Sequence, residues 1–225
     1  MIDKFVTTLA AALDGIDHGA SVMIGGFGAV GQPDALVEGL LARRLRDLVV
    51  IANNAGGDFG GLPKLIEQGA IAKVICSYPR AGGKTAFDAM LEQGRIALEI
   101  VPQGTLAERI RAAGAGVPAF YTPTGAGTRL AEGKETRMIK GQEVVLEHAL
   151  SADFALVQAW EADRWGNLTY RGTGRNFNPI MATAARMTIA VTHHMRPLGA
   201  LDPEQVMTPG IFVQRVLWQE QIHDG

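Results

Sequence analysis

The residue of greatest chemical interest is Gln103, which lies between an apolar run and a helical pattern. The run at residues 96–101 predicts a buried strand that ends at Pro102. In an open parallel sheet, ligands bind just outside the carboxyl ends of the strands, and Gln103 follows such an end. An amide is neither a nucleophile nor a useful base, but it donates and accepts hydrogen bonds. We therefore expect Gln103 to polarise or stabilise a group that another residue attacks.

A glycine-rich run follows the first apolar strand and leads into a predicted helix. It consists of Gly25, Gly26, Phe27, Gly28, Ala29, Val30 and Gly31. Glycine permits a sharp turn and lets backbone N–H groups approach a phosphate at a helix N-terminus. The spacing departs from the G-x-G-x-x-G pattern of dinucleotide-binding proteins, and no acidic residue ends the second strand. The run is therefore either a tight structural turn or a ligand cradle.

Polar side chains also follow the next two predicted strands. Asn53 and Asn54 come directly after the strand at Leu48–Ala52. Asparagines in this position commonly satisfy the backbone of a turn, and contact with a ligand is the alternative. Arg80 and Lys84 follow the third strand. They either lie in a solvated loop or pair with a carboxylate or a phosphate, which Arg80 can do through two parallel hydrogen bonds.

Other familiar catalytic groups lack the spacing of a site. His193 and His194 are adjacent, so on a strand they point to opposite faces, and the remaining histidines are isolated. We therefore predict no metal site. No serine lies in a G-x-S-x-G turn, and Cys76 sits in an apolar run typical of a buried thiol. The glutamates fit helix, loop or strand-end positions, so the sequence offers no nucleophile.

The elements that must position these residues alternate between strand and helix in the first half of the chain. Apolar strands are predicted at 21–24, 48–52, 73–76, 96–101, 154–160 and 189–191, and helices at 4–13, 34–41, 64–68, 84–93 and 106–113. Strands that are apolar throughout favour an α/β fold, with a largely parallel open sheet and helices on both faces. Residues 115–147, rich in Gly, Pro and Thr, indicate a β-rich irregular second lobe. We expect one domain over residues 1–225, with a frayed tail at 219–225.

The composition excludes several classes of function. Of the 225 residues, 47% are hydrophobic and 20% are charged, as is typical of globular proteins. The formal net charge of −2 gives no electrostatic basis for binding nucleic acid or an anionic membrane. No apolar run approaches the roughly 20 residues that span a bilayer, and no signal-peptide pattern is present. Because the single cysteine also fits a reducing compartment, we expect a cytoplasmic protein.

Taken together, these segments resemble the A subunit of family I 3-oxoacid CoA-transferases. The matching pieces are Gly25-Gly26-Phe27-Gly28, Asn53-Asn54-Ala55-Gly56, the run from Val101-Pro102-Gln103-Gly104 to Thr122-Pro123-Thr124-Gly125, and residues 132–135, 164–170 and 175–179. The resemblance covers nearly the whole chain. The long run at 101–125 is specific, whereas a glycine turn alone would not be.

The resemblance implies a half-enzyme. In this family a glutamate attacks the acyl-CoA, and the reaction passes through an acyl-glutamyl anhydride and a glutamyl-CoA thioester. That glutamate belongs to the B subunit, or to the second half of fused enzymes, in agreement with the missing nucleophile. The resemblance further implies that Gln103 is an oxyanion-hole residue and that the glycine turn at 25–31 binds CoA. Coenzyme A is then a substrate, as succinyl-CoA, with no permanently bound cofactor, and the assembly is an A2B2 hetero-oligomer.

The resemblance also bears on the acceptor acid. Residues 76–80 and 163–166 look closer to 3-oxoadipate CoA-transferases than to acetoacetate enzymes. We therefore expect Arg80, with Lys84, to meet the distal carboxylate of a dicarboxylic acid, and Asn53 and Asn54 to line the substrate site. The other interpretations are an acetoacetate transferase, a CoA- or nucleotide-binding module without activity, and an isomerase- or regulator-like relative on the same scaffold.

Overall fold

The centre of the molecule is an eight-stranded parallel sheet with the order β1-β14-β12-β9-β2-β3-β4-β5. The computed structural model describes residues 2–55, 61–79 and 86–219. The strands of the sheet are β1 (Phe5–Val6), β2 (Ser21–Ile24), β3 (Leu48–Ala52), β4 (Ile71–Cys76), β5 (Ala97–Ile100), β9 (Ala152–Gln158), β12 (Ala185–Thr192) and β14 (Arg215–Trp218). These strands are rich in Val, Ile, Leu and Ala, because both faces of the sheet are covered.

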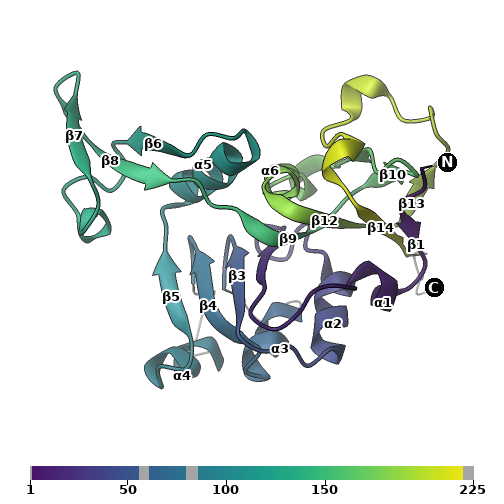
Figure 1. The fold of residues 1–225 in the computed structure, drawn as a ribbon, viewed down its shortest axis with the longest axis horizontal. Helices are drawn as coiled ribbons and strands as arrows, with labels where there is room; N and C mark the ends of the chain where they lie inside the picture. Colours follow the sequence, from purple (N-terminus) through teal and green to yellow (C-terminus); the bar gives the residue numbers. More distant parts are fainter. Residues whose placement is uncertain (1, 56–60, 80–85, 220–225) are drawn as a thin grey trace.

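The side chains of each central strand alternate between two cores. Val22 and Ile24 of β2 point into one core, and Met23 points into the other. Helices α1–α4 cover the first face and helices α5 and α6 cover the second (Figure 1). They are α1 (Leu9–Ala12), α2 (Asp34–Ala42), α3 (Gly61–Glu67), α4 (Ala86–Glu92), α5 (Gln103–Gly114) and α6 (Asn178–Thr183). The predicted α/β class, with helices on both faces, is confirmed.

The direction of strand addition reverses between β2 and β9. From β2 the sheet continues through β3 and β4 to β5, and from β9 it continues through β12 and β14 to the opposite edge. In open α/β sheets, the crevice outside the carboxyl ends of the strands at such a switch point is the usual ligand site. The glycine turn at residues 25–31 directly follows β2 and therefore lies at this point.

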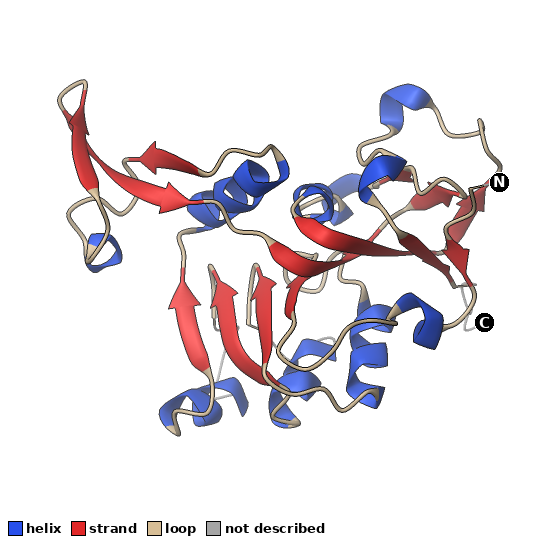
Figure 2. Ribbon diagram, viewed as in Figure 1, coloured by secondary structure: helices blue, strands red, loops and turns tan. Residues whose placement is uncertain are grey.

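Two three-stranded sheets accompany the main sheet. One has the order β11-β10-β13, from β10 (Glu161–Asp163), β11 (Leu168–Thr169) and β13 (His194–Arg196). The other, which we call the second lobe, is antiparallel with the order β6-β8-β7, from β6 (Ala119–Thr122), β7 (Thr136–Ile139) and β8 (Gln142–His148). The β7–β8 hairpin extends away from the main sheet, and α5 packs against β6 and β8 (Figures 1 and 2).

Short 3₁₀ helices connect the remaining elements. They are η1 (Arg129–Ala131), η2 (Gly172–Gly174), η3 (Pro203–Gln205) and η4 (Gly210–Phe212). Within the described ranges, no helix combines the length and apolar character needed to cross a membrane. Of the tail predicted to fray, only Gln219 belongs to the described residues. The single domain over residues 1–225 stays a prediction.

The helix predicted at residues 4–13 is wrong in its first half. Phe5–Val6 forms β1, which pairs in parallel with β14 at the edge of the main sheet. Helix α1 begins only at Leu9, where the Thr8 hydroxyl accepts a hydrogen bond from the Ala11 backbone at 3.1 Å. The apolar spacing in this segment does fit a helix. Pairing with β14, more than 200 residues away along the chain, overrides that local preference.

A chain of ion pairs joins α5 to the main sheet and to the second lobe. The Glu99 carboxylate on β5 accepts hydrogen bonds from Lys73 Nζ at 2.6 Å and from Arg109 Nη1 at 2.9 Å. Arg109 Nε also donates to the His148 carbonyl of β8 at 2.9 Å. Burial disfavours the charge of Glu99, but the hydrogen bonds from the two cations outweigh it and hold the pKa of the Glu99 carboxyl below its ordinary value.

Replacing Glu99 with glutamine is expected to lower the free energy of unfolding by about 1–2 kcal/mol at pH 7, between the effects of exposed and buried ion pairs. A carboxyl whose pKa is depressed in the folded protein stabilises it above the unfolded pKa, about 4.3. That contribution is lost as the pH falls through the folded pKa. Urea denaturation at several pH values should therefore show the difference between wild type and Glu99→Gln narrowing in acid.

The matched control is Glu108→Gln, which breaks an exposed pair with Arg111 on the same helix. We expect a smaller loss of stability from this variant. Equal losses in the two variants, or a Glu99→Gln difference that does not change with pH, would contradict the role assigned to the Glu99 ion pairs.

Candidate active site

The segments that follow β3 and β4 are held together by backbone hydrogen bonds. The Asn53 carbonyl accepts the N–H groups of Ser77 and Tyr78, at 3.0 and 3.1 Å. Asn53 and Asn54 follow β3, Ser77 and Tyr78 follow β4, and Gln103 follows β5 after a two-residue connection. Because these strands are parallel neighbours, their carboxyl ends meet at one edge of the sheet. The structure therefore brings Asn53, Asn54 and Gln103 together.

The Gln103 amide is oriented by a buried asparagine. Gln103 Nε2 donates to Asn53 Oδ1 at 2.9 Å, and the same oxygen accepts a hydrogen bond from Ser77 Oγ at 2.8 Å. Only 4% of Asn53 is exposed, whereas Gln103 is exposed. An amide nitrogen carries two hydrogens, so one N–H of Gln103 is used by Asn53. Within the described residues, the second N–H has no hydrogen-bond partner and remains for a ligand.

Gln103 occupies the first position of α5, three residues earlier than the helix start predicted from the sequence. Pro102 precedes it as the N-cap and makes no side-chain cap hydrogen bond. Proline fixes its own φ, and the strand–helix junction is therefore short and stiff. The Gln103 side chain is thus carried by the first residue of a helix, separated from a strand by two residues, which favours a fixed position for its amide.

A pocket of about 510 Å³ opens beside these amides. It is lined by Phe27, Gly28, Asn53, Asn54, Ser77, Tyr78 and Gln103. The rings of Phe27 and Tyr78 are 49% and 60% exposed and provide apolar walls, and the amides provide the polar groups. A concave site with apolar walls and a few oriented polar groups is typical of small-molecule binding, and this volume lies in the usual range.

The pocket can polarise a carbonyl group, and its described lining offers no activated nucleophile, because the Ser77 hydroxyl donates to Asn53 and no described lining residue can act on it as a base. None of the described residues that line it carries a carboxylate, an imidazole or a thiol. Among the described residues, no group of His, Cys, Asp and Glu is arranged to hold a metal ion. The Cys76 thiol is fully buried in the core on the face of α1–α4, and burial raises its pKa to about 11. The predicted burial of Cys76 is confirmed.

The glycine turn at 25–31 is closed by its own hydrogen bonds. The N–H groups of Phe27 and Val30 donate to each other's carbonyl groups, at 3.0 and 3.1 Å. Gly26 N donates to Asn176 Oδ1 at 3.1 Å, and Gly28 N donates to Asn54 Oδ1 at 3.2 Å. Because these N–H groups already have partners, they do not form an open cradle for a phosphate.

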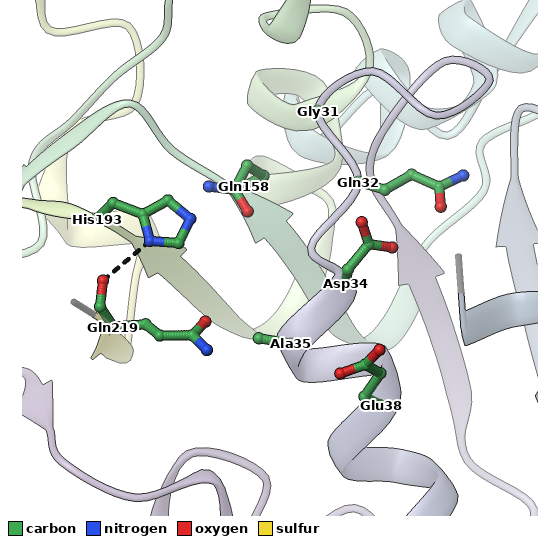
Figure 3. A pocket seen from close by; sticks show the side chains of 8 residues that line it. All are labelled: Gly31, Gln32, Asp34, Ala35, Glu38, Gln158, His193 and Gln219. Carbon is green, nitrogen blue, oxygen red and sulfur yellow. Dashed lines mark hydrogen bonds between the residues drawn. The ribbon is translucent and has the colours of Figure 1, made fainter. Parts of the chain in front are cut away.

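A second pocket, of about 400 Å³, lies at the other end of the glycine turn (Figure 3). It is lined by Gly31, Gln32, Asp34, Ala35, Glu38, Gln158, His193 and Gln219. Figure 3 shows the carboxylates of Asp34 and Glu38 on α2, with His193 across the pocket and bonded to the Gln219 carbonyl at 2.9 Å. Burial, and then the charge of Glu38, raise the pKa of Asp34. Sequence reasoning missed this pocket because its residues come from the segment after β2, the end of β9, and the residues after β12 and β14.

Several polar residues singled out in the sequence have structural partners. Asp163 Oδ1 accepts the backbone N–H groups of Trp165 and Asn167 at 3.0 Å, so it caps the turn between β10 and β11. Asn176 and Asn178, in the matching segment at 175–179, form hydrogen bonds to the glycine turn. Arg80 and Lys84 lie outside the described residues.

Comparison with known sequences identifies relatives over almost the full chain. The sequence profile of the family described as Coenzyme A transferase matches residues 6–219. The chain is 54% identical over 217 residues to the A subunit of the 3-oxoadipate CoA-transferase of Pseudomonas putida, covering 96% of this chain and 94% of that protein. It is 50% identical over 214 residues to the A subunit of the succinyl-CoA:3-ketoacid coenzyme A transferase of Xanthomonas campestris, covering 95% of this chain and 88% of that protein.

Comparison with solved structures shows the same fold in an acyl-CoA transferase from Escherichia coli O157:H7, determined as a thioester complex with CoA. The TM-score is 0.83 at 19% sequence identity, and the match covers 97% of this chain and 47% of that one. This chain therefore spans about half the length of the Escherichia coli protein. On the match over residues 6–219 and the identities to these relatives, the chain belongs to the coenzyme A transferase family.

Proposed function

We propose that this chain is the A subunit of a two-chain enzyme that moves CoA from succinyl-CoA to a 3-oxoacid, and that the acid is 3-oxoadipate. The observation that carries the proposal is a pocket with an oriented amide donor and, among its described residues, no carboxylate, imidazole or thiol. Two further facts support it. The Pseudomonas putida relative at 54% identity is the A subunit of a 3-oxoadipate CoA-transferase, and the chain spans about half of the Escherichia coli acyl-CoA transferase.

In the proposed reaction, the B subunit supplies a glutamate whose carboxylate attacks the thioester carbonyl of succinyl-CoA, and the C=O electron pair moves onto oxygen. Collapse of this intermediate expels the CoA thiolate and leaves a succinyl-glutamyl anhydride. The thiolate attacks the glutamyl carbonyl, which releases succinate and forms a glutamyl-CoA thioester. The carboxylate of 3-oxoadipate then attacks that thioester, and the same steps in reverse deliver CoA to the acid and regenerate the glutamate.

Gln103 has a defined part in this scheme. Each addition step places negative charge on a carbonyl oxygen, and the second N–H of Gln103 is available to donate to it. Asn53 holds the amide in place before the charge develops, so little reorganisation is needed. Asn54 faces the same pocket while its Oδ1 accepts from Gly28, and we assign it to substrate binding with Asn53.

The glycine turn at 25–31 is proposed to contact CoA through its surface rather than through a ring of N–H groups. Phe27 and Val30 are each 49% exposed at its tip. A Cβ built on Gly28 would meet nothing within 4 Å, so its backbone can be approached closely. This assignment treats Gly25, Gly26, Phe27, Gly28, Ala29, Val30 and Gly31 as one structural unit, in which residues 27–30 are exposed and the glycines on either side hold them in place.

The partner completes the site in this proposal. Exposed aromatic rings at the mouth of the pocket, Phe27 and Tyr78, provide apolar surface that a second chain can cover. We propose a hetero-oligomer of A and B chains with A2B2 stoichiometry, located in the cytoplasm. Coenzyme A enters as part of a substrate, and no permanently bound cofactor is required. The second candidate, an acetoacetate transferase, has support from the 50% identity to the Xanthomonas campestris relative.

Replacing Gln103 with alanine is expected to lower kcat of the A–B complex about 100- to 1,000-fold, as removal of one oxyanion-hole donor does elsewhere. Steady-state rates with succinyl-CoA and 3-oxoadipate measure this. Gln142→Ala, which replaces an exposed glutamine on β8 in the second lobe, is the control and should leave kcat unchanged.

Trapping the thioester with borohydride or hydroxylamine should modify a glutamate of the B subunit. A modified residue on this chain, or full activity of Gln103→Ala, would refute the half-site assignment.

Replacing Arg80 with alanine tests the acceptor. Loss of a charge-assisted hydrogen-bond pair to a distal carboxylate should raise KM for 3-oxoadipate about 10- to 100-fold, corresponding to roughly 1.5–3 kcal/mol. KM for acetoacetate, which has no second carboxylate, should change much less. KM for 3-oxoadipate measured with Lys84→Ala shows whether Lys84 also contributes to binding of the distal carboxylate. Equal effects of Arg80→Ala on the two acids would exclude Arg80 as the residue that selects a dicarboxylic acid.

A further inference from the structure

The Asn178 side chain lies at the centre of the switch point between β2 and β9. It is fully buried. Its Oδ1 accepts the N–H of Gln158, the last residue of β9, at 3.0 Å. Its Nδ2 donates to the carbonyl groups of Gly31 and Gly174, each at 2.9 Å. One short side chain therefore connects β9, the end of the glycine turn and η2.

Asn176 makes a parallel set of contacts on the same turn. Its Oδ1 accepts from Gly26 N at 3.1 Å, and its Nδ2 donates to the Val30 carbonyl at 3.0 Å. The same Nδ2 donates to the Thr173 carbonyl at 2.8 Å. Asn176 thus binds both arms of the turn, about 150 residues away in sequence. We call Asn176 and Asn178 the asparagine clamp.

The clamp explains two of the glycines. A Cβ built on Gly25 would overlap Asn178 Oδ1, so a larger residue there would displace the Asn178 side chain from its hydrogen bonds. A Cβ on Gly31 would lie 2.6 Å from the Gly174 carbonyl and 2.9 Å from Asn176 Nδ2, and Gly31 also has a φ of +70°. These positions are therefore filled by the protein itself. Only the far end of the turn, at Phe27 and Gly28, reaches the pocket of Gln103.

The tip of the turn is consequently held from two sides. Gly28 N donates to Asn54 Oδ1 beside the pocket, and Gly26 and Val30 are bonded to Asn176 behind it. Asn54 is next in the chain to Asn53, which orients Gln103. The distance between the turn tip and the Gln103 amide is set by these few hydrogen bonds, since the tip itself is half exposed and has little packing of its own.

We propose that Asn176 and Asn178 are positioning residues, which fix the tip of the glycine turn relative to Gln103 so that the thioester end of a CoA substrate is held against the amide. The proposal rests on the function proposed above. Asparagine suits the task because one short side chain offers both an acceptor and two donors. Aspartate would set a second acceptor oxygen against the carbonyl groups that Nδ2 now contacts, and the turn would lose those bonds.

The test compares Asn176→Asp and Asn176→Ala in the A–B complex, with hydrogen exchange and kinetics measured on the same samples. Asn176 is half-buried, whereas Asn178 is fully buried, so substitutions of Asn176 carry a smaller risk of unfolding the protein than substitutions of Asn178. Asn167→Asp is the matched control, because Asn167 also bonds through both side-chain groups, to Asp163 and Gly210, but far along the chain from the glycine turn. Mass spectrometry reports exchange in the peptide over residues 25–32.

We expect faster exchange at residues 25–32 in both Asn176 variants, and KM for succinyl-CoA raised at least fivefold with KM for the acceptor acid unchanged. Asn167→Asp should lower the melting temperature and leave both KM values unchanged. A general structural defect would instead reduce the fraction of enzyme molecules that are active. It would therefore lower the apparent kcat without raising KM for succinyl-CoA alone.

Hydrogen exchange at wild-type rates in the Asn176 variants would overturn the positioning role. Faster exchange at residues 25–32 with an unchanged KM for succinyl-CoA would overturn it as well. If the wild-type complex transfers CoA to no 3-oxoacid, the proposed function fails. The exchange rates still decide in that case whether the asparagines hold the turn, so the two failures are distinguishable.

Discussion

The hydrogen bond from Gln103 Nε2 to Asn53 Oδ1 is the contact on which the candidate site depends. Asn53 is almost fully buried, and its backbone carbonyl accepts from both residues that follow β4. Movement of its side chain would break the hydrogen bonds from Ser77 and Gln103 inside a packed environment. Asn53 thus holds the exposed amide donor of Gln103 in a fixed position relative to three parallel strands. Electrostatic stabilisation of a developing charge requires a donor that is fixed in this way.

Helix α5 carries that donor and is itself held on three sides. Leu106 and Ile110 are buried against the main sheet, and Arg109 bonds to Glu99 and to the second lobe. At its C-terminal end Gly114 packs so closely on Thr183 of α6 that a Cβ would overlap the Thr183 hydroxyl oxygen. The apolar contacts fix the height of the helix above the sheet. The polar contacts fix its rotation, and with it the direction of the Gln103 side chain.

Much of the central sheet follows from local patterns. Strands buried on both faces must be apolar throughout, so β2 and β3 could be placed from the sequence with the bounds that the structure has. The location of Gln103 was also predicted, because it comes after an apolar strand that ends at a proline. The prediction that this strand is buried was wrong, since β5 lies at the edge of the sheet and Ala97 and Ile100 are exposed. The sequence patterns offered no nucleophile, and the supply of one by a second chain stays a prediction.

What local patterns could not show are contacts between distant segments. The bond between Gln103 and Asn53 depends on the register of three strands, and the asparagine clamp joins segments about 150 residues apart. Nothing in the spacing of Asn176 and Asn178 distinguishes a residue that holds another loop from one that touches a ligand. The edge strand β1 was missed for the same reason, since its partner β14 is at the other end of the chain.

The position of Cys76 has a consequence for an enzyme proposed to handle a thiol. Cys76 is the last residue of β4 and immediately precedes Ser77 of the pocket, yet its side chain points into the core on the other face of the sheet. Disulfide exchange requires an accessible thiolate, and burial keeps this thiol protonated with a pKa of about 11. Oxidised coenzyme A in the pocket would therefore find no accessible thiol on Cys76, the single cysteine of the chain, with which to form a mixed disulfide.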